Sequence, residues 1–220
     1  MFSRFAIYVV PDGVWGDFGA QWLGWDIRTG QEVAFRYPDL ASYTKRPRKY
    51  GFHGTIKAPF RLADGCLESE LTDAAEVLAR GFSPFALSSL QLSQIGPFFA
   101  LTAPNENAKL RALSDKMVSE LEHFRAPLSD AELQRRRQSR LSARQDASLQ
   151  KWGYPHVFED FKFHLTLTGP IKQAEDVRAD IQTALGPMLE APLTVQDVCV
   201  VGETAEGRFH LVKRCPFEAS

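Results

Sequence analysis

The sequence contains little cysteine and no pattern of metal ligands. Its three cysteines, Cys66, Cys199 and Cys215, include no Cys-x-x-Cys pair. An odd number of scattered thiols is typical of a reduced cytoplasmic protein and argues against a disulfide framework or a zinc site. His-x-His, His-Glu-x-x-His and carboxylate clusters at ligand spacing are also absent. The sequence therefore favours a protein without a metal or cofactor.

Three common signatures of nucleotide binding and nucleophilic catalysis are missing as well. The chain has no Walker loop, no Gly-x-Gly-x-x-Gly after a predicted strand and no Gly-x-Ser-x-Gly. These absences argue against a P-loop enzyme, a dinucleotide-binding fold and a serine hydrolase with a nucleophile elbow.

Long apolar runs and excess charge are also lacking. The run from Phe5 to Val10 stops at Pro11-Asp12-Gly13, too early for a signal peptide or a membrane span. We therefore expect a cytoplasmic protein with no membrane partner. The formal net charge of −1 excludes a generally basic, nucleic-acid-coating surface, so any anion binding must be local.

The sequence does contain one strand motif written twice. Both copies read His, any residue, Thr, aliphatic, two further residues, Pro, hydrophobic, and they occupy residues 53–60 and 164–171. Alternate side chains of a strand point to the same face, so His53 pairs with Thr55 and His164 with Thr166. Apolar residues alternate with the polar ones in the second copy, as expected for a half-buried strand.

The residues after the two motifs also repeat in the same order. Gly96 and Gly207 each follow the histidine of their half by 43 residues, and Phe98 and Phe209 by 45. Each half is predicted as strand, helix, strand, strand, and a further strand opens the chain at Arg4–Val10. The predicted helices span about 64–81, 107–124 and 177–185, and the later strands about 85–95, 98–102, 193–201 and 209–212.

This order predicts an α+β fold with two lobes related by an approximate two-fold axis. Mainly antiparallel sheets would face a central cleft and bring both His/Thr pairs together. The 220 residues, 44% of them hydrophobic, suit one such domain. Lobe one is expected over about 1–124 and lobe two over about 156–220, with an inserted helical segment over about 125–155.

Two basic stretches have open interpretations. Residues 44–49 carry four cations just before the first motif. The inserted segment starts with a capping box, Ser129 and Glu132, which predicts a helix rich in arginine over about 133–151. Each stretch is either a solvated face or a basic approach to a phosphorylated ligand.

Two imidazoles on facing strands suit general acid–base catalysis. An unperturbed histidine has a pKa near 6.5, so one ring can act as base and the other as acid at neutral pH. The hydroxyls of Thr55 and Thr166 would donate to phosphate oxygens and stabilise developing charge. A phosphodiester held between His53 and His164 would then be cleaved in line without a metal ion.

The two motifs resemble those of a known family, the two-histidine phosphoesterases with a LigT-like bilobal fold. Its motif, His-x-Thr/Ser-hydrophobic once per lobe, matches residues 53–56 and 164–167. The resemblance implies that His53 and His164 are the catalytic pair and that Thr55 and Thr166 hold the phosphate. The context at residues 50–60, 152–155 and 163–169 is similar to a bacterial branch associated with phosphonate utilisation operons. That branch implies a small cyclic phosphate, such as the phosphoribosyl 1,2-cyclic phosphate made by carbon–phosphorus lyase.

Four further residues are candidates for substrate binding. Lys57 shares the predicted face of His53 and would neutralise phosphate, although a lysine at a strand end often points into solvent. Arg48 and Tyr50 precede the first motif and would contact a second phosphate or a base. Tyr8, on the first strand, would line the cleft or pack in the core.

Three hypotheses about function follow. The first is a metal-independent phosphodiesterase that opens a small cyclic phosphate on a nucleotide or sugar. The second is an RNA phosphodiesterase acting on 2′,3′-cyclic phosphate ends or 2′–5′ linkages, with the arginine-rich helix as its RNA contact. The third is a non-catalytic protein that binds a phosphate ligand in the same cleft. A small phosphorylated substrate is the expected partner, and a monomer is the expected state.

Overall fold

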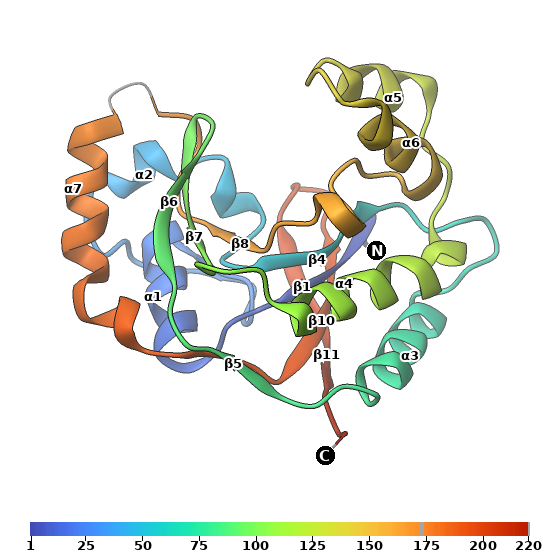
Figure 1. Cartoon of the computed structure of the whole chain (residues 1–220), viewed down its shortest axis with the longest axis horizontal. Helices are drawn as coiled ribbons and strands as arrows, with labels where there is room; N and C mark the ends of the chain where they lie inside the picture. The colour runs from blue at the N-terminus through green and yellow to red at the C-terminus, as the bar shows by residue number, and fades with distance from the viewer. Residues whose placement is uncertain (172–173, 220) are drawn as a thin grey trace.

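A computed structural model describes residues 1–171 and 174–219 as an α+β fold built on a seven-stranded sheet (Figure 1). The strand order is β11-β10-β1-β4-β8-β7-β6, and the described neighbours pair antiparallel. The strands are β1 Arg4–Val9, β4 Gly54–Phe60, β6 Gln91–Ile95, β7 Phe98–Thr102, β8 His164–Thr166, β10 Asp197–Glu203 and β11 Phe209–Pro216. Two short pairs lie outside this sheet: β2 Trp25–Asp26 with β3 Gln31–Glu32, and β5 Phe85–Leu87 with β9 Leu193–Val195.

The two motif strands meet at a thin junction inside this sheet. β4 and β8 share one partnered pair of residues, Gly54 and Leu165. Position 54 favours glycine, because a Cβ there would lie 2.1 Å from the ring of Phe163, which would have to move. The expected pair of facing sheets is therefore one continuous sheet, with the two motifs side by side at its centre.

In the sheet, the hairpin of each half of the repeat lies on the side of the motif strand of the other half. The hairpin β6–β7 pairs with β8, and the hairpin β10–β11 joins β4 through β1. Gly96 and Gly207 turn these hairpins at φ of 55° and 75°, which glycine adopts most readily. The sheet order thus crosses the predicted lobe boundaries. This exchange of hairpins cannot be seen in the sequence, because the sequence repeat is the same with or without it.

The helices cover the sheet around one main apolar core. They are α1 Gly13–Leu23, α2 Leu40–Tyr43, α3 Glu68–Ala79, α4 Ala108–Glu120, α5 Asp130–Arg137, α6 Ala143–Trp152 and α7 Ala174–Leu185, with 3-10 turns η1 Pro47–Lys49, η2 Glu122–Phe124, η3 Phe158–Asp160 and η4 Gly186–Glu190. Apolar residues of α1, α3, α4 and α7 pack with Phe5, Ile7 and Val9 of β1. The opposite face of β1 carries Tyr8 and a smaller apolar cluster with Phe209. Among the described residues, no helix is long and apolar enough to cross a membrane.

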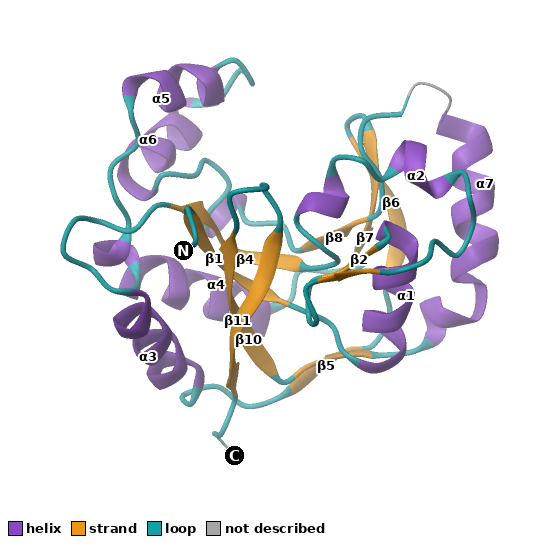
Figure 2. Cartoon of the chain, turned by 180° about the vertical axis from the view of Figure 1, so that it is seen from behind, coloured by secondary structure: helices purple, strands orange, loops and turns teal. Residues whose placement is uncertain are grey.

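The inserted segment forms two helices where one was expected. α5 begins at the predicted capping box, in which Ser129 accepts a hydrogen bond from the backbone of Glu132. A second capping box, Ser142 with Gln145, begins α6. Arg140, between them, has a left-handed φ of 50°, which is incompatible with a continuous right-handed helix. Both helices stand together at one end of the molecule (Figure 2).

Candidate active site

A cavity of about 720 Å³ lies over the junction of β4 and β8. We call it the His/Thr cavity, because His53, Thr55 and Thr166 line it. His164 is not part of the lining, but its ring centroid is 6.0 Å from that of Phe98 in the cavity wall. The antiparallel register directs His53 toward Thr166 and Thr55 toward His164. The two motifs therefore share one face of the sheet, with His164 at the border of the cavity.

The two imidazoles are held in the same way. Nδ1 of His53 lies 2.9 Å from the carbonyl oxygen of Gly51, and Nδ1 of His164 lies 2.9 Å from that of Lys162. A carbonyl oxygen only accepts, so each Nδ1 carries a proton and each neutral ring keeps Nε2 as an acceptor. Nε2 of His53 accepts from the hydroxyl of Thr55 at 3.1 Å. The sequence repeat thus extends to side-chain geometry.

Burial makes both rings weak bases. Burial, with a smaller contribution from the nearby His164, lowers the pKa of His53 to about 4, although the hydrogen bond to Gly51 opposes the shift. Burial also lowers the pKa of His164, against the hydrogen bond to Lys162. Tyr8 contributes by stacking on His53, with ring centroids 3.7 Å apart. Both rings are therefore neutral at pH 7 in the free protein.

Anion binding to the His/Thr cavity is expected to take up protons. A bound anion raises the pKa of a neighbouring imidazole. Binding therefore adds a proton to the ring at any pH between the pKa of the free protein, about 4 for His53, and the higher pKa of the complex. Affinity should therefore fall as pH rises through the bound-state pKa. The measurement is sulfate titration calorimetry near pH 6 in buffers of different ionisation enthalpy, because sulfate does not itself titrate in this range. A binding enthalpy that is the same in all buffers would contradict the expectation.

Four arginines line the same cavity: Arg4, Arg46, Arg135 and Arg136. No carboxylate occurs among the described lining residues. Arg4 is neutralised by Glu203, since its Nη2 donates to Oε1 at 2.8 Å. Arg46 and Arg135 are exposed at the rim. The site is therefore locally positive although the whole chain has a net charge of −1. Among the described residues, no group of three His, Cys, Asp or Glu side chains is placed to hold a metal ion.

Lys57 does not face the His/Thr cavity. The pairing of β1 with β4 shifts between Ile7–Lys57 and Tyr8–Thr55, which makes Ile56 an extra residue in a β-bulge. The bulge turns Lys57 to the other face of the strand, where its Nζ donates to Glu122 and to the carbonyl oxygen of Val118 at 2.8 and 3.0 Å. The prediction that Lys57 shares the face of His53 is wrong.

Arg48 also points away from the His/Thr cavity. Its Nε donates to the carbonyl oxygen of Leu23 at 2.9 Å, and its Nη2 donates to that of Ala41 at 3.0 Å. Its guanidinium lies over the ring of Phe35, 4.5 Å from the centroid. Arg48 therefore fastens the loop before the first motif to α1, and it is not among the described residues that line the His/Thr cavity, contrary to its expected place beside a substrate.

The other two candidates do line the His/Thr cavity. Tyr50 stacks on Phe209, with ring centroids 5.3 Å apart, and Tyr8 stacks on His53. Both therefore form part of the wall beside the first imidazole. Their contact with a substrate stays a prediction.

Sequence reasoning missed the arginines that do face the cavity. Arg46 belongs to the cationic run before the first motif, and Arg135 and Arg136 belong to the arginine-rich segment. Nothing in the sequence distinguishes them from Arg48, or from Arg144, which forms an ion pair with Asp160 at 2.8 Å. Tertiary packing decides which guanidinium groups reach the site.

Comparisons with known proteins place this geometry in a family. The profile of a family described as "Protein of unknown function (DUF1045)" matches residues 55–210. The chain belongs to the DUF1045 family. The structure of E. coli LigT complexed with ATP is similar to this DUF1045 chain with a TM-score of 0.50, 14% identity and coverage of 99% of both chains. This likeness shows a LigT-like fold, in agreement with the family that the two motifs indicated.

Two curated relatives of this DUF1045 chain carry the same name, Ribose 1,5-bisphosphate phosphokinase PhnN. The relative from Janthinobacterium sp. (strain Marseille) is 33% identical over 230 residues, covering 98% of this chain and 51% of the relative. The relative from Laribacter hongkongensis (strain HLHK9) is 31% identical over 177 residues, covering 78% of this chain and 41% of the relative. The chain thus spans about half the length of these relatives, or less.

Proposed function

We propose that this chain is a phosphodiesterase that opens a small cyclic phosphate by general acid–base catalysis. His53 and His164 would be the catalytic pair, and no metal ion would take part. The observation that carries the proposal is the duplicated imidazole geometry, with each Nδ1 tied to a carbonyl oxygen two residues earlier. Two rings held in the same tautomer beside a positively charged cavity suit a reaction that needs one base and one acid.

The reaction uses one water molecule. One imidazole accepts a proton from water at Nε2 while the water oxygen bonds to phosphorus. The ester bond on the opposite side of phosphorus breaks, and the second imidazole, protonated when the anion binds, gives its proton to the leaving sugar oxygen. Thr55, Thr166 and the arginine groups donate to the remaining phosphate oxygens. Each proton transfer is worth on the order of 10²–10⁴ in rate.

The name of the two relatives favours a ribose phosphate as the substrate. Their name gives ribose 1,5-bisphosphate as the substrate of a kinase. Opening a 1,2-cyclic phosphate on ribose 5-phosphate at the O2 side yields ribose 1,5-bisphosphate. We therefore propose phosphoribosyl 1,2-cyclic phosphate as the substrate of this chain, placing its reaction directly before phosphorylation of the product.

The kinase reaction itself is assigned to the part of the relatives that this chain does not cover. A kinase of the P-loop type needs a Gly-x-x-x-x-Gly-Lys-Ser/Thr loop, and this sequence has none. The matched region is only 51% and 41% of the two relatives, which leaves each room for a second unit.

The test is turnover in the presence of EDTA. The panel holds phosphoribosyl 1,2-cyclic phosphate, a 2′,3′-cyclic nucleotide, a 2′–5′ dinucleotide, and ribose 1,5-bisphosphate with ATP and magnesium in a separate reaction without EDTA. We expect phosphorus NMR to show ribose 1,5-bisphosphate forming from the first compound at a rate that EDTA does not change. Preference for the dinucleotide would favour the RNA alternative. Phosphorylation of ribose 1,5-bisphosphate, or no turnover at all, would overturn the proposal.

A further inference from the structure

Among the described charged side chains of α5 and α6, Arg136 is the one with a buried donor that lacks a partner. Its Nε is buried and has no hydrogen-bond partner among the described residues. Other arginines of α5 and α6 are satisfied by acids: Arg137 contacts Asp146 at 2.6 and 3.0 Å, and Arg144 contacts Asp160 at 2.8 and 3.0 Å. A buried guanidinium donor without an acceptor is unfavourable, so this position favours an external anion.

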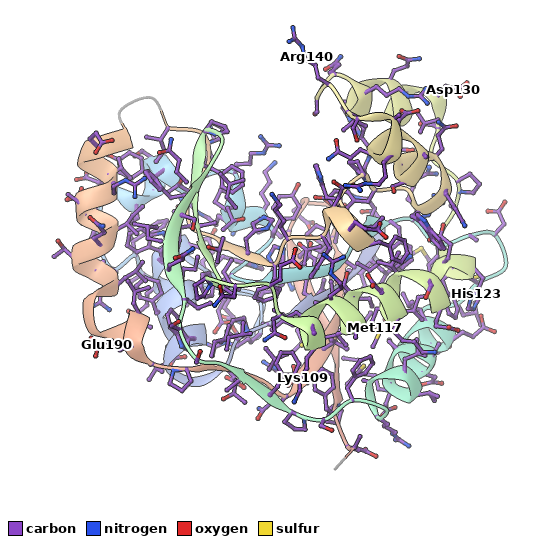
Figure 3. All side chains as sticks on the ribbon, viewed as in Figure 1. Lys109, Met117, His123, Asp130, Arg140 and Glu190 are labelled. Atoms are coloured by element: carbon purple, nitrogen blue, oxygen red, sulfur yellow. The ribbon has the colours of Figure 1, made fainter. Side chains whose placement is uncertain are left out.

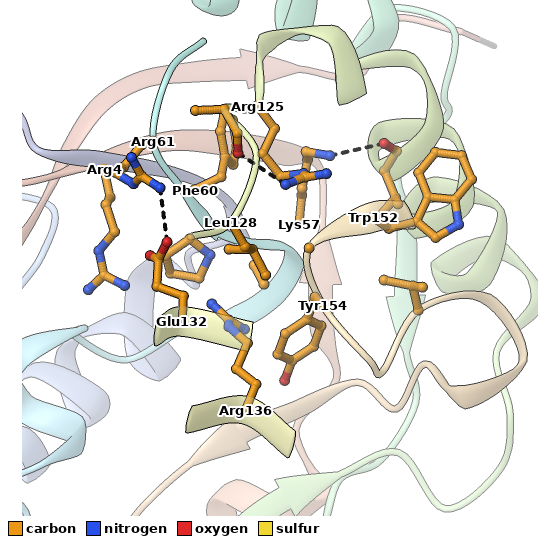
Figure 4. Close-up of a pocket in the computed structure, with 16 residues that line it drawn as sticks. Arg4, Lys57, Phe60, Arg61, Arg125, Leu128, Glu132, Arg136, Trp152 and Tyr154 are labelled. Atoms are coloured by element: carbon orange, nitrogen blue, oxygen red, sulfur yellow. Dashed lines mark hydrogen bonds and ion pairs between the residues drawn. The ribbon is translucent and has the colours of Figure 1, made fainter. Parts of the chain in front are cut away.

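The acid nearest to Arg136 along α5 is already occupied. Glu132 accepts from Arg61 at 2.9 Å and from the backbone nitrogen of Ser129 at 2.8 Å. Figure 4 shows Arg61 reaching Glu132, while the Arg136 guanidinium lies beside Tyr154 without a marked interaction. The Cζ atom of Arg136 is 5.9 Å from the centroid of the Tyr154 ring. The side chain is thus positioned by packing, and its hydrogen-bonding edge is free to receive a ligand.

Arg136 sits where two cavities adjoin. A nearly filled cavity, with room of only about 10 Å³, shares five residues with the His/Thr cavity: Arg4, Ala58, Pro59, Arg136 and Tyr154. Ala58 and Pro59 follow Thr55 on β4 by three and four positions, which corresponds to on the order of 10 Å along a strand. The Arg136 end of the His/Thr cavity is therefore on the order of 10 Å from Thr55, a span that suits a ribose carrying a phosphate group on each side.

We propose that Arg136, assisted by Arg135 at the rim, binds a second phosphate of the substrate, one that does not react. This inference rests on the proposed function and gives it specificity. A ribose with a 1,2-cyclic phosphate and a 5-phosphate has its two phosphorus atoms on opposite sides of the ring. The cyclic phosphate lies at the histidines, and the 5-phosphate lies at α5. A planar guanidinium donates two parallel hydrogen bonds to phosphate oxygens, which makes it selective for this group.

The experiment compares phosphoribosyl 1,2-cyclic phosphate with ribose 1,2-cyclic phosphate, which lacks the 5-phosphate. The wild type should prefer the first substrate in kcat/KM. In R136A this preference should fall by roughly 10- to 100-fold, the range expected for charge-assisted hydrogen bonds. R136K keeps the charge but loses the planar fork, so its preference should be intermediate.

The matched control is R140A. Arg140 is an exposed residue of the same segment, and Figure 3 shows it at the outer end of this segment, pointing away from the molecule. R140A removes the same charge but should keep the wild-type preference. If R136A slows both substrates equally, or keeps the preference, the second-phosphate site is wrong.

A binding measurement separates this inference from the proposed function. Calorimetry with ribose 5-phosphate should show at least tenfold weaker binding to R136A than to wild type, and unchanged binding to R140A. Weaker binding together with no turnover by the wild type would support the phosphate site and overturn the phosphodiesterase. Equal binding to R136A and wild type would overturn the site even if the cyclic phosphate is hydrolysed. R135A, at an exposed position, provides a second variant that keeps the test valid if R136A fails to fold.

Discussion

Replacing His53 or His164 by glutamine is expected to lower kcat on the cyclic phosphate by about 10²–10⁴, the usual worth of one general acid or base. Glutamine retains an amide that can still hydrogen-bond, but it does not transfer a proton near neutral pH. The loss of kcat in the double variant should be much smaller than the product of the two single losses, since the two rings act in one proton-transfer event. Steady-state kinetics of the three variants against wild type provides the measurement.

The control for this result is His123→Gln. His123 is exposed on η2 and contacts Phe124, with ring centroids 4.1 Å apart. Its replacement should leave turnover within about twofold of wild type. Thermal unfolding should show all variants folded. A His164→Gln variant with normal turnover would be the decisive contrary result, because it would leave His53 without an acid–base partner.

Removing the carboxylate of Glu122 is expected to destabilise the fold by about 3 kcal/mol, a typical loss when one partner of a buried ion pair is removed. Lys57 is only 3% exposed, and its Nζ contacts Glu122 at 2.8 Å. Glu122 also accepts from Nε of Arg125 at 2.8 Å. The Glu122→Gln variant would leave a buried ammonium and a guanidinium without a counter-charge. Urea unfolding gives the free energy that checks this value.

Two comparisons make this result specific. Glu120→Gln breaks an exposed pair with Lys116, 3.2 Å apart on the same helix, and should change stability by less than about 1 kcal/mol. Lys57→Met replaces the buried charge by an apolar chain of similar length, so it should be less harmful than Glu122→Gln. It should also keep kcat/KM within about threefold. A folded Lys57→Met variant with turnover reduced tenfold or more would indicate that Lys57 takes part in the reaction.

The repeated motif predicted which side chains share a face, because β-strand alternation needs no tertiary information. It placed His53 with Thr55 and His164 with Thr166, and the structure brings these pairs to one face of one sheet. The equal offsets placed Gly96 and Gly207 before the last strand of each half, and in the structure both glycines turn a hairpin there. Such local rules hold wherever the strand stays regular.

The same rule was wrong where the strand is irregular. Lys57 follows a bulge at Ile56, and this bulge depends on the pairing of β4 with β1, more than 40 positions away in the sequence. The arginine-rich segment shows a second limit. Arg136 and Arg137 are neighbours on one helix, yet one faces the site and the other pairs with Asp146. Docking of α5 makes this distinction, and no local pattern encodes it.

The exchange of hairpins between the halves has an evolutionary consequence. A chain with a single repeat would leave the edge of its motif strand unpaired, and an unpaired edge can form hydrogen bonds with a strand of a second copy of the chain. Two identical chains that swapped hairpins would close both edges, forming a homodimer with one histidine from each subunit on its axis. Duplication and fusion of such an ancestor would give the strand exchange seen here. β1 joins only the hairpin β10–β11 to β4, while β7 pairs directly with β8. The stacking of Tyr8 on His53 therefore belongs to one half only, because β1, which carries Tyr8, lies between β4 and β10.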